Sequence, residues 1–174
     1  MVVSVDAIKE LRGITAASIA ECKKALHETG GDVQKAVTLL RKRGLEIAAA
    51  KQDRVAKDGR IEAYVHHGNK IGVLLEVDCE SDFVAKNSDF AQFTKDVAMH
   101  IAAIAPTYVK KEDVPAEVIE QEKNKEDFYK HNCLLEQPFV KDPSITIKDY
   151  VGSIVTKIGE NVIVRRFTRY QIGR

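Results

Sequence analysis

The chain has 174 residues, of which 44% are hydrophobic and 30% are charged, and its formal net charge is +1. These values predict a globular protein of one or two domains, and the near-zero net charge provides no general attraction to nucleic acid or to an anionic membrane. Three widely spaced cysteines without a CxxC pair argue against a disulfide framework and a zinc site. No apolar run approaches the ~20 residues that span a bilayer, so we expect a cytoplasmic protein.

The first thirty residues carry signals for two short helices. Ser4 can cap a first helix, and Gly13 is expected to end it. Thr15 can cap a second helix, which Gly30 and Gly31 would end because glycine tolerates positive φ. Three residues of the second helix fall on one predicted apolar face: Ile19, Cys22 and Leu26.

The third helix has the clearest pattern. Asp32 is the expected N-cap, and the basic residues just before Gly44 complement the negative C-terminal end of a helix. Apolar side chains recur between them at helical spacing, at Val33, Ala36, Val37 and Leu40. Residues 45–58 are rich in Ala, Lys and Arg with a thin apolar stripe, which indicates a linker. Residues 1–54 are therefore predicted to form a helical module with its linker.

A β-hairpin is predicted next. IEAYV alternates so that Ile61, Ala63 and Val65 share the apolar side of a strand. HHGNK has the composition of a turn, and the continuous apolar run IGVLLEV over residues 71–77 indicates a more deeply buried strand. We expect this hairpin to form part of a sheet in the second half of the chain.

A long amphipathic helix follows the hairpin. Ser88 or Asp89 can cap it, and Pro106 closes it. Its apolar face consists of Phe90, Phe93, Val97, Ile101 and Ile104. This face should pack across the sheet.

The remaining elements complete a predicted α+β core over residues 55–174. Residues 110–132 are strongly charged, with a helix start at VPAE. After a proline-containing loop, a helix is predicted over residues 147–158 and a third strand over residues 162–167. Strands and helices do not alternate strictly, so the predicted fold is a three-helix N-terminal bundle followed by a small antiparallel sheet packed by helices.

No catalytic or ligand-binding motif stands out. His66 or His67 with Cys79 forms a conceivable nucleophile pair, although a buried cysteine and a solvated turn histidine are commoner. The absence of GxxxxGK[ST] and GxGxxG disfavours nucleotide binding by the chain itself. RRFTRYQIGR mixes cations with aromatics, but an edge strand protected by arginine is commoner than an RNA-binding strand. We expect a protein that is not an enzyme and has no cofactor, metal site or direct nucleic-acid contact.

The stretch CESDFVAKN, over residues 79–87, places an aromatic residue beside an acid at the exit of a buried strand. In one interpretation, Phe83 closes the end of the core while Ser81 or Asp82 caps the next turn. In the other, Phe83 protrudes beside the carboxylate as an anchor for a partner's pocket. The pattern alone does not decide between these interpretations.

Four collinear motifs resemble the translation elongation factor Ts family. IKELRGITAASIAECKKALHETGGDVQKAVTLLRKRG is similar to its N-terminal ubiquitin-associated-like (UBA-like) module. EVDCESDFVAKNSDF is similar to its signature E-x-N-C-E-T-D-F-V-A-x-N, and LLEQPFVKD and KIGENVIVRRF resemble its C-terminal core. The resemblance runs in order through almost the whole chain, which makes a chance match very improbable.

The resemblance implies a guanine-nucleotide exchange factor for the GTPase elongation factor Tu. In the family, the aspartate and phenylalanine of the signature push into the GTPase and disturb its magnesium and phosphate region, and these positions match Asp82 and Phe83. A hairpin-turn histidine that supports this wedge matches His67. Family contacts at the end of the first helix and the start of the second match Arg12 and Ile19.

Some features depart from the longer family members. Ala20 stands at one of two positions where the family favours methionine, and the charged segment 110–132 is shorter than the corresponding family hairpin. The chain carries one signature and one hairpin, as do short members that work as homodimers. One subunit would then supply Asp82 and Phe83, and its mate would supply His67.

A second functional class remains open at this point. The N-terminal bundle could belong to a non-enzymatic interaction adaptor that binds ubiquitin-like or nascent-chain partners. Such an adaptor would bind through residues 1–54 alone and would leave nucleotide release from a GTPase unchanged.

Overall fold

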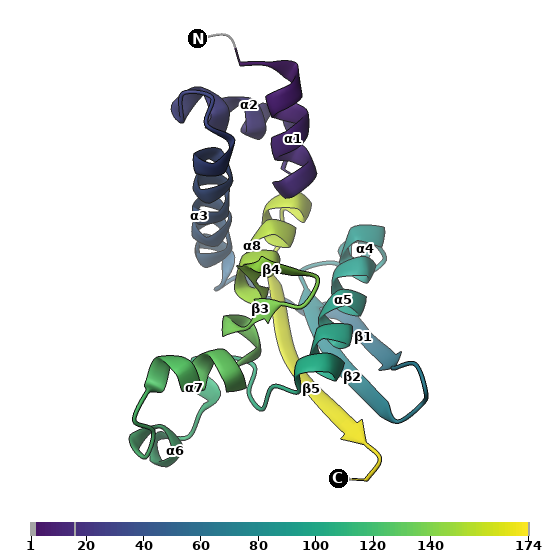
Figure 1. The fold of residues 1–174 in the computed structure, drawn as a ribbon. Helices are drawn as coiled ribbons and strands as arrows, with labels where there is room; N and C mark the ends of the chain where they lie inside the picture. The colour runs from purple at the N-terminus through teal and green to yellow at the C-terminus, as the bar shows by residue number, and fades with distance from the viewer. Residues whose placement is uncertain (1–2, 16, 174) are drawn as a thin grey trace.

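The structure is a computed structural model and describes residues 3–15 and 17–173. Three helices form one end of an elongated molecule, a sheet with its covering helices forms the middle, and a small helical arm projects to one side (Figure 1). The helices of the N-terminal bundle are α1 (Val5–Thr15), α2 (Ile19–Glu28) and α3 (Val33–Lys51). This arrangement confirms the predicted α+β class with a three-helix bundle ahead of the sheet.

The main sheet has three antiparallel strands in the order β1-β2-β5. They are β1 (Asp58–Val65), β2 (Ile71–Cys79) and β5 (Val162–Gln171). Helix α5 (Ser88–Ile104) crosses one face of this sheet, and α8 (Ile147–Ile158) leads into β5 (Figure 1). The predicted hairpin, covering helix and third strand are therefore confirmed.

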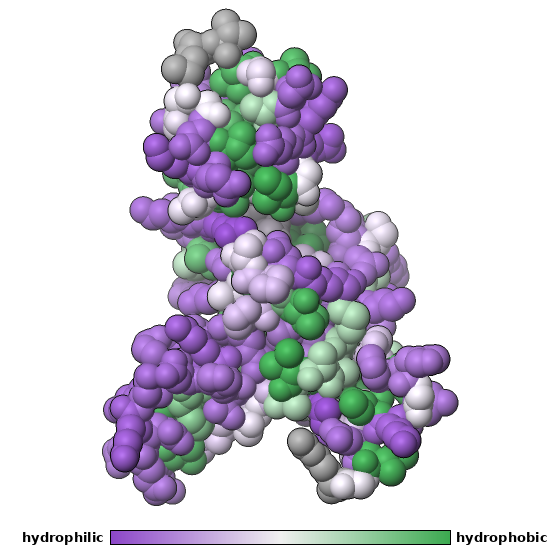
Figure 2. Space-filling view, viewed as in Figure 1, coloured by the Kyte–Doolittle hydropathy of each residue, from purple (hydrophilic) through white to green (hydrophobic). Residues whose placement is uncertain are grey.

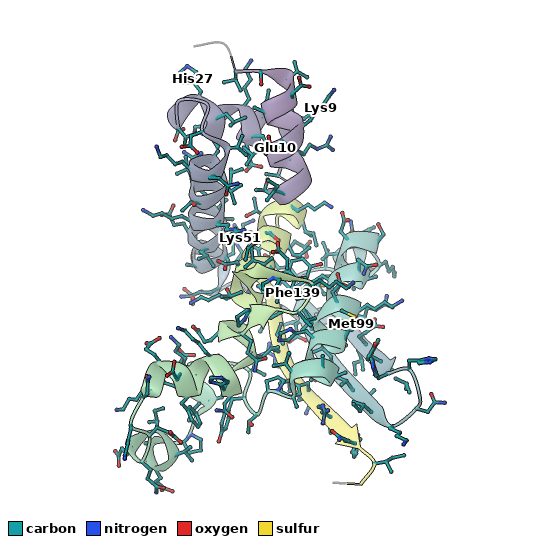
Figure 3. The ribbon with its side chains drawn as sticks, in the orientation of Figure 1. Lys9, Glu10, His27, Lys51, Met99 and Phe139 are labelled. Atoms are coloured by element: carbon teal, nitrogen blue, oxygen red, sulfur yellow. The ribbon has the colours of Figure 1, made fainter. Side chains whose placement is uncertain are left out.

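The smaller elements lie around this core. They are α4 (Asp82–Ala85), α6 (Ala116–Glu120), α7 (Lys125–Asn132), the 3-10 turns Lys111–Asp113 and Leu134–Glu136, β3 (Pro138–Phe139) and β4 (Asp142–Thr146). The arm formed by α6 and α7 is largely hydrophilic in Figure 2, in keeping with its charged sequence. The β3–β4 pair is too short for an alternating pattern to be visible in the sequence. Phe139 of this pair lies where it faces α5 (Figure 3).

Two hydrophobic clusters stabilise the fold, one in the bundle and one beneath the sheet. The predicted face of α5 is buried at Phe90, Phe93, Val97 and Ile101, whereas Ile104 is 46% exposed at the end of the helix. The cap of α5 is Asn87, whose side chain accepts a hydrogen bond from the backbone N–H of Asp89 at 2.7 Å, rather than Ser88 or Asp89.

The boundaries of the first two helices differ from the prediction. Helix α1 continues through Gly13 to Thr15, because an exposed glycine in a helical conformation weakens a helix without ending it. The N-cap of α2 is Ser18 rather than Thr15, since Ser18 and Glu21 form a reciprocal capping box. Ile19 does not share the buried face of α2 and is 59% exposed.

Helix α3 also continues past its predicted end at Gly44, so residues 45–51 are helical rather than part of a linker. The close packing of α3 depends mainly on Gly152 of α8, where an added Cβ would lie 3.1 Å from the Gly44 carbonyl carbon; a Cβ on Gly44 would lie 3.4 Å from Gly152, an ordinary contact. Ile47 and Ala48 then pack against the main core. Helix α3 therefore belongs to both hydrophobic clusters and joins the bundle to the sheet.

Strand β1 alternates as predicted, but with the opposite face inward. Glu62 and Tyr64 are half-buried on the side covered by α5, whereas Ile61 and Val65 are 68% and 63% exposed. The single helix α5 covers only one face, so the apolar side of β1 remains open. This open face is a surface that the sequence pattern did not predict.

Candidate functional site

The segment after β2 forms a protruding tip. The side chain of Ser81 accepts a hydrogen bond from the backbone N–H of Val84 at 3.5 Å and so caps the single helical turn α4. Val84 is buried in the main core, whereas Phe83 is 83% exposed. The interpretation in which Phe83 closes the core is therefore wrong, because Val84 has that position.

The acid of the tip carries an ion pair on the same turn. Lys86 Nζ donates to Asp82 Oδ2 at 2.8 Å, and this hydrogen bond lowers the pKa of the Asp82 carboxyl. Asp82 is thus ionised at neutral pH and lies beside the exposed Phe83 ring. The contribution of Lys86 was missed, although its i,i+4 spacing from Asp82 could have revealed it.

Cys79 is buried at the end of β2. Its Sγ donates to the Ser81 carbonyl oxygen at 3.2 Å, and burial raises the pKa of the thiol to about 11. The thiol is protonated at neutral pH and is a poor nucleophile. His66 and His67 lie in the turn at the opposite end of β2, roughly 25 Å away at about 3.3 Å per residue, so the fold does not form the Cys/His pair.

The same geometry separates His67 from the tip within one chain. His67 is exposed in the hairpin turn, and the ring Nδ1 of the neighbouring His66 lies 3.1 Å from the Tyr64 hydroxyl. In Figure 1 the turn between β1 and β2 and the short helix α4 occupy opposite ends of the sheet. A single chain therefore does not bring His67 to Asp82 or Phe83.

Arg12 and Ile19 both line a groove between the α1–α2 end of the bundle and the α3–α8 pair. The groove encloses about 820 Å³, and its rim includes Ile14, which is 46% exposed at the end of α1. Ile14 was not among the predicted site residues, because α1 was expected to end at Gly13. The groove thus combines four cationic side chains, among them Arg12, with the two exposed isoleucines Ile14 and Ile19.

The open face of the sheet presents a second apolar surface, which we call the open sheet face. Its members come from all three strands and the residue pairs Ala63–Leu74 and Gly72–Tyr170 lie side by side across it. Its apolar part consists of Ile61, Ala63, Val65, Gly72, Leu74 and Tyr170, and the strand register places Thr168 and the ion pair Glu76–Arg166 on the same face. Leu74 is 50% exposed and Tyr170 is 69% exposed, so large apolar area faces away from α5.

The arginines of β5 are engaged within the chain. Arg165 Nε donates to Asp78 at 2.7 Å, Arg166 Nε donates to Glu76 at 2.5 Å, and Arg169 donates to the Ala102 carbonyl. Arg165 and Arg166 are thus in ion pairs, whereas Arg169 bonds to a neutral carbonyl. Among the described residues, no group of three or more His, Cys, Asp or Glu is arranged to hold a metal ion, and no helix is long and apolar enough to cross a membrane.

Comparison with known proteins identifies the family. The family model described as Elongation factor TS matches residues 4–127 and 125–174. Elongation factor Ts of Herpetosiphon aurantiacus is 47% identical over 99% of this chain and 99% of its own length. Elongation factor Ts of Caldanaerobacter subterraneus is 45% identical over 98% of this chain and 97% of its own length, and that of Heliobacterium modesticaldum is 49% identical over 95% and 88%. The chain therefore belongs to the elongation factor Ts family, the guanine-nucleotide exchange factors of translation elongation.

Proposed function

We propose that this protein accelerates GDP release from elongation factor Tu by inserting the Asp82–Phe83 tip beside the bound Mg²⁺ and phosphates. The observation that carries the proposal is the 83% exposure of Phe83 on a turn whose neighbouring Val84 is anchored in the core. A large exposed ring on an anchored turn is a typical binding anchor, because its burial in a partner's pocket costs little conformational entropy. The chain thus offers the GTPase a preformed wedge.

The chemistry of the partner's site explains how a wedge releases nucleotide. Mg²⁺ bridges phosphate oxygens, so displacing it or its water ligands weakens several strong charge interactions together. The ionised carboxylate of Asp82 suits competition for the polar groups around that metal, while Phe83 holds the partner's elements apart. The factor makes and breaks no covalent bond in this process and is not a catalyst of a chemical reaction.

Thermodynamic linkage sets the size of the effect. If the factor weakens GDP binding, GDP must weaken binding of the factor by the same ratio. A 10⁴-fold ratio corresponds to a coupling free energy of about 5.5 kcal/mol. A ternary complex of factor, GTPase and GDP is therefore transient, and a cytoplasmic excess of GTP then fills the emptied site.

The groove at the bundle supplies a second contact. Arg12 and Ile19 line it together, and Ile14 extends its apolar rim. We propose that an element of the GTPase docks in this groove, with Arg12 pairing an acidic group. Because α3 joins the bundle to the sheet, docking in the groove would orient the tip on the nucleotide site.

We also propose that the functional unit is a homodimer formed through the open sheet face. Within one chain His67 lies a strand's length from Phe83, so only a second chain can bring a His67 to the tip. Two open sheet faces stacked around a two-fold axis would bury Ile61, Leu74 and Tyr170 and bring each turn to the partner's tip. The exposed apolar character of this face supports a second copy as its occupant.

The direct test is release of labelled GDP from elongation factor Tu in excess GTP, with and without this protein. The proposal predicts faster release, which saturates as the factor concentration rises. An unchanged release rate would overturn the proposal and would favour the adaptor, in which the isolated bundle binds a partner without affecting any GTPase. Isothermal titration of residues 1–54 against ubiquitin-like proteins would examine that alternative.

A further inference from the structure

A reciprocal pair of glutamates joins the loop after β2 to the loop after α8. Glu160 Oε2 accepts hydrogen bonds from the backbone N–H groups of Glu80 and Ser81, each at 3.0 Å, and Glu160 Oε1 accepts one from Ser81 Oγ at 2.6 Å. In return, Glu80 Oε1 accepts a hydrogen bond from the backbone N–H of Asn161 at 2.6 Å. Two loops about eighty positions apart are thereby fixed to each other.

The glutamate pair fixes Ser81, the residue directly before the Asp82–Phe83 tip. Ser81 is the cap of α4, and Glu160 binds both its backbone and its hydroxyl. A helix of four residues has no stability of its own in water, so its direction is set by what holds its ends. Glu160 holds the first end, and burial of Val84 holds the other, which leaves Phe83 exposed between them.

The same connection continues to the end of α3. Asn161 Nδ2 donates to the Arg54 carbonyl oxygen at 2.9 Å, and Arg54 lies 3.6 Å from the Glu80 carboxylate. Lys51, seen in Figure 3 at the C-terminal end of α3, donates to the Gly159 carbonyl. The loop that carries Glu160 is therefore attached to the helix that carries the bundle.

We propose that Glu160 is a positioning residue for nucleotide exchange, which acts through Ser81 by holding Asp82 and Phe83 in the direction required to enter the GTPase. This inference rests on the proposed role of the tip. Glu160 belongs to neither hydrophobic cluster, and its bonds go to the two residues directly before the tip. A rotation about Glu80 and Ser81 would swing the Phe83 ring, and small misplacements of an acting group are costly.

The experiment compares four proteins in the labelled-GDP release assay: wild type, Glu160→Ala, Phe83→Ala and the double variant. If the unclamped tip points correctly about a tenth of the time, Glu160→Ala slows release about tenfold. Adding Glu160→Ala to Phe83→Ala is expected to slow release by much less than tenfold, because the ring is gone and only Asp82 remains to be positioned. Independent, multiplying effects of the two substitutions would overturn the inference.

Three further variants separate positioning from charge and from stability. Glu160→Gln keeps a carbonyl oxygen that accepts from both backbone N–H groups, so it should restore most of the rate; a rate as low as that of Glu160→Ala would contradict positioning. Glu136→Ala removes a carboxylate paired with Lys111, away from both the tip and the open sheet face, and should match wild type. If Glu160→Ala unfolds at the assay temperature, Ser81→Ala removes the hydroxyl that donates to Glu160 and caps α4. It should slow release when Phe83 is present and should have little effect when added to Phe83→Ala.

The outcomes distinguish this inference from the function on which it rests. A normal release rate with Phe83→Ala would overturn the role of the tip itself. Slow release with Phe83→Ala but a normal rate with Glu160→Ala would leave that role intact and would overturn the positioning role of Glu160.

Discussion

Strand β2 (Ile71–Cys79) adjoins two different kinds of exposed apolar surface, one at its exit and one along its open face. At its exit, Phe83 is a single ring on a turn that hydrogen bonds and a buried valine hold in place. Along its open side, Leu74 and Tyr170 lie flat among residues of three strands. A lone anchored ring suits insertion into a pocket, whereas a flat apolar face suits another flat face. The difference suggests two separate interfaces, one for the GTPase and one for a second copy.

The largest expected effect is at the exit end. Phe83→Ala should slow factor-stimulated GDP release about 100-fold, or about 3 kcal/mol, because a central aromatic anchor is lost. The fold and the oligomeric state should be unchanged, since the ring is exposed. Stopped-flow release of labelled GDP and circular dichroism measure the two properties. Val5→Ala, at a 65% exposed site in the bundle, is the matched control and should release GDP at the wild-type rate.

On the open sheet face, a substitution should change the oligomeric state. Leu74→Asp places a charge opposite the apolar surface of a second copy, so the dimer should dissociate at least tenfold more readily while each chain stays folded. Sedimentation equilibrium measures the change. A wild-type protein that is monomeric at micromolar concentration would contradict the proposed dimer, and so would a Leu74→Asp protein with unaltered association.

A smaller but more specific effect connects the two interfaces. Phe83→Ala and His67→Ala homodimers should both be slow, but mixing them allows heterodimers in which one intact tip meets one intact His67. Statistical exchange of subunits in a two-fold dimer would restore about a quarter of the sites. Release assays before and after mixing measure the gain. If mass spectrometry shows that heterodimers have formed but the release rate does not rise, His67 does not act on the partner's tip.

The smallest effect concerns the pH dependence of stability. The backbone N–H of Val140 donates to His100 Nδ1 at 3.2 Å, so Nε2 carries the proton that it donates to Gln137 Oε1 at 2.9 Å. Burial lowers the pKa of His100, and its neutral form is favoured in the folded state. Stability should therefore be complete above about pH 6.5, the ordinary histidine pKa, and should decline as the pH falls below it, because the unfolded chain binds the proton first. Urea unfolding between pH 7.5 and 5 measures this slope, which His100→Asn should flatten.

Local signals predicted much of this molecule. The periodic apolar face of α5 is buried as expected at Phe90 and Phe93, and Asp32 caps α3. Asp82 and Phe83 lie in a short contiguous signature, and their proposed role comes from the family resemblance that this signature carries. In each of these cases the relevant neighbours lie within a few positions along the chain, where spacing is informative.

The features that were missed depend on distant residues. Gly44 does not end α3, because Gly152 on α8 approaches it closely and the helix continues to the main core. Glu160 binds Ser81 from about eighty positions away, and no local pattern indicates that contact. The side of β1 that faces outward was decided by which face α5 covers. Alternation along a strand shows that two faces differ, but it does not show which one is covered.

The central claim is that the tip couples factor binding to nucleotide release. The most direct measurement is the affinity of this protein for elongation factor Tu with and without saturating GDP, for wild type and for Phe83→Ala. GDP should weaken wild-type binding strongly and should weaken Phe83→Ala binding about 100-fold less, because the ring is what opposes the bound nucleotide. An equal effect of GDP on the two proteins would contradict this coupling.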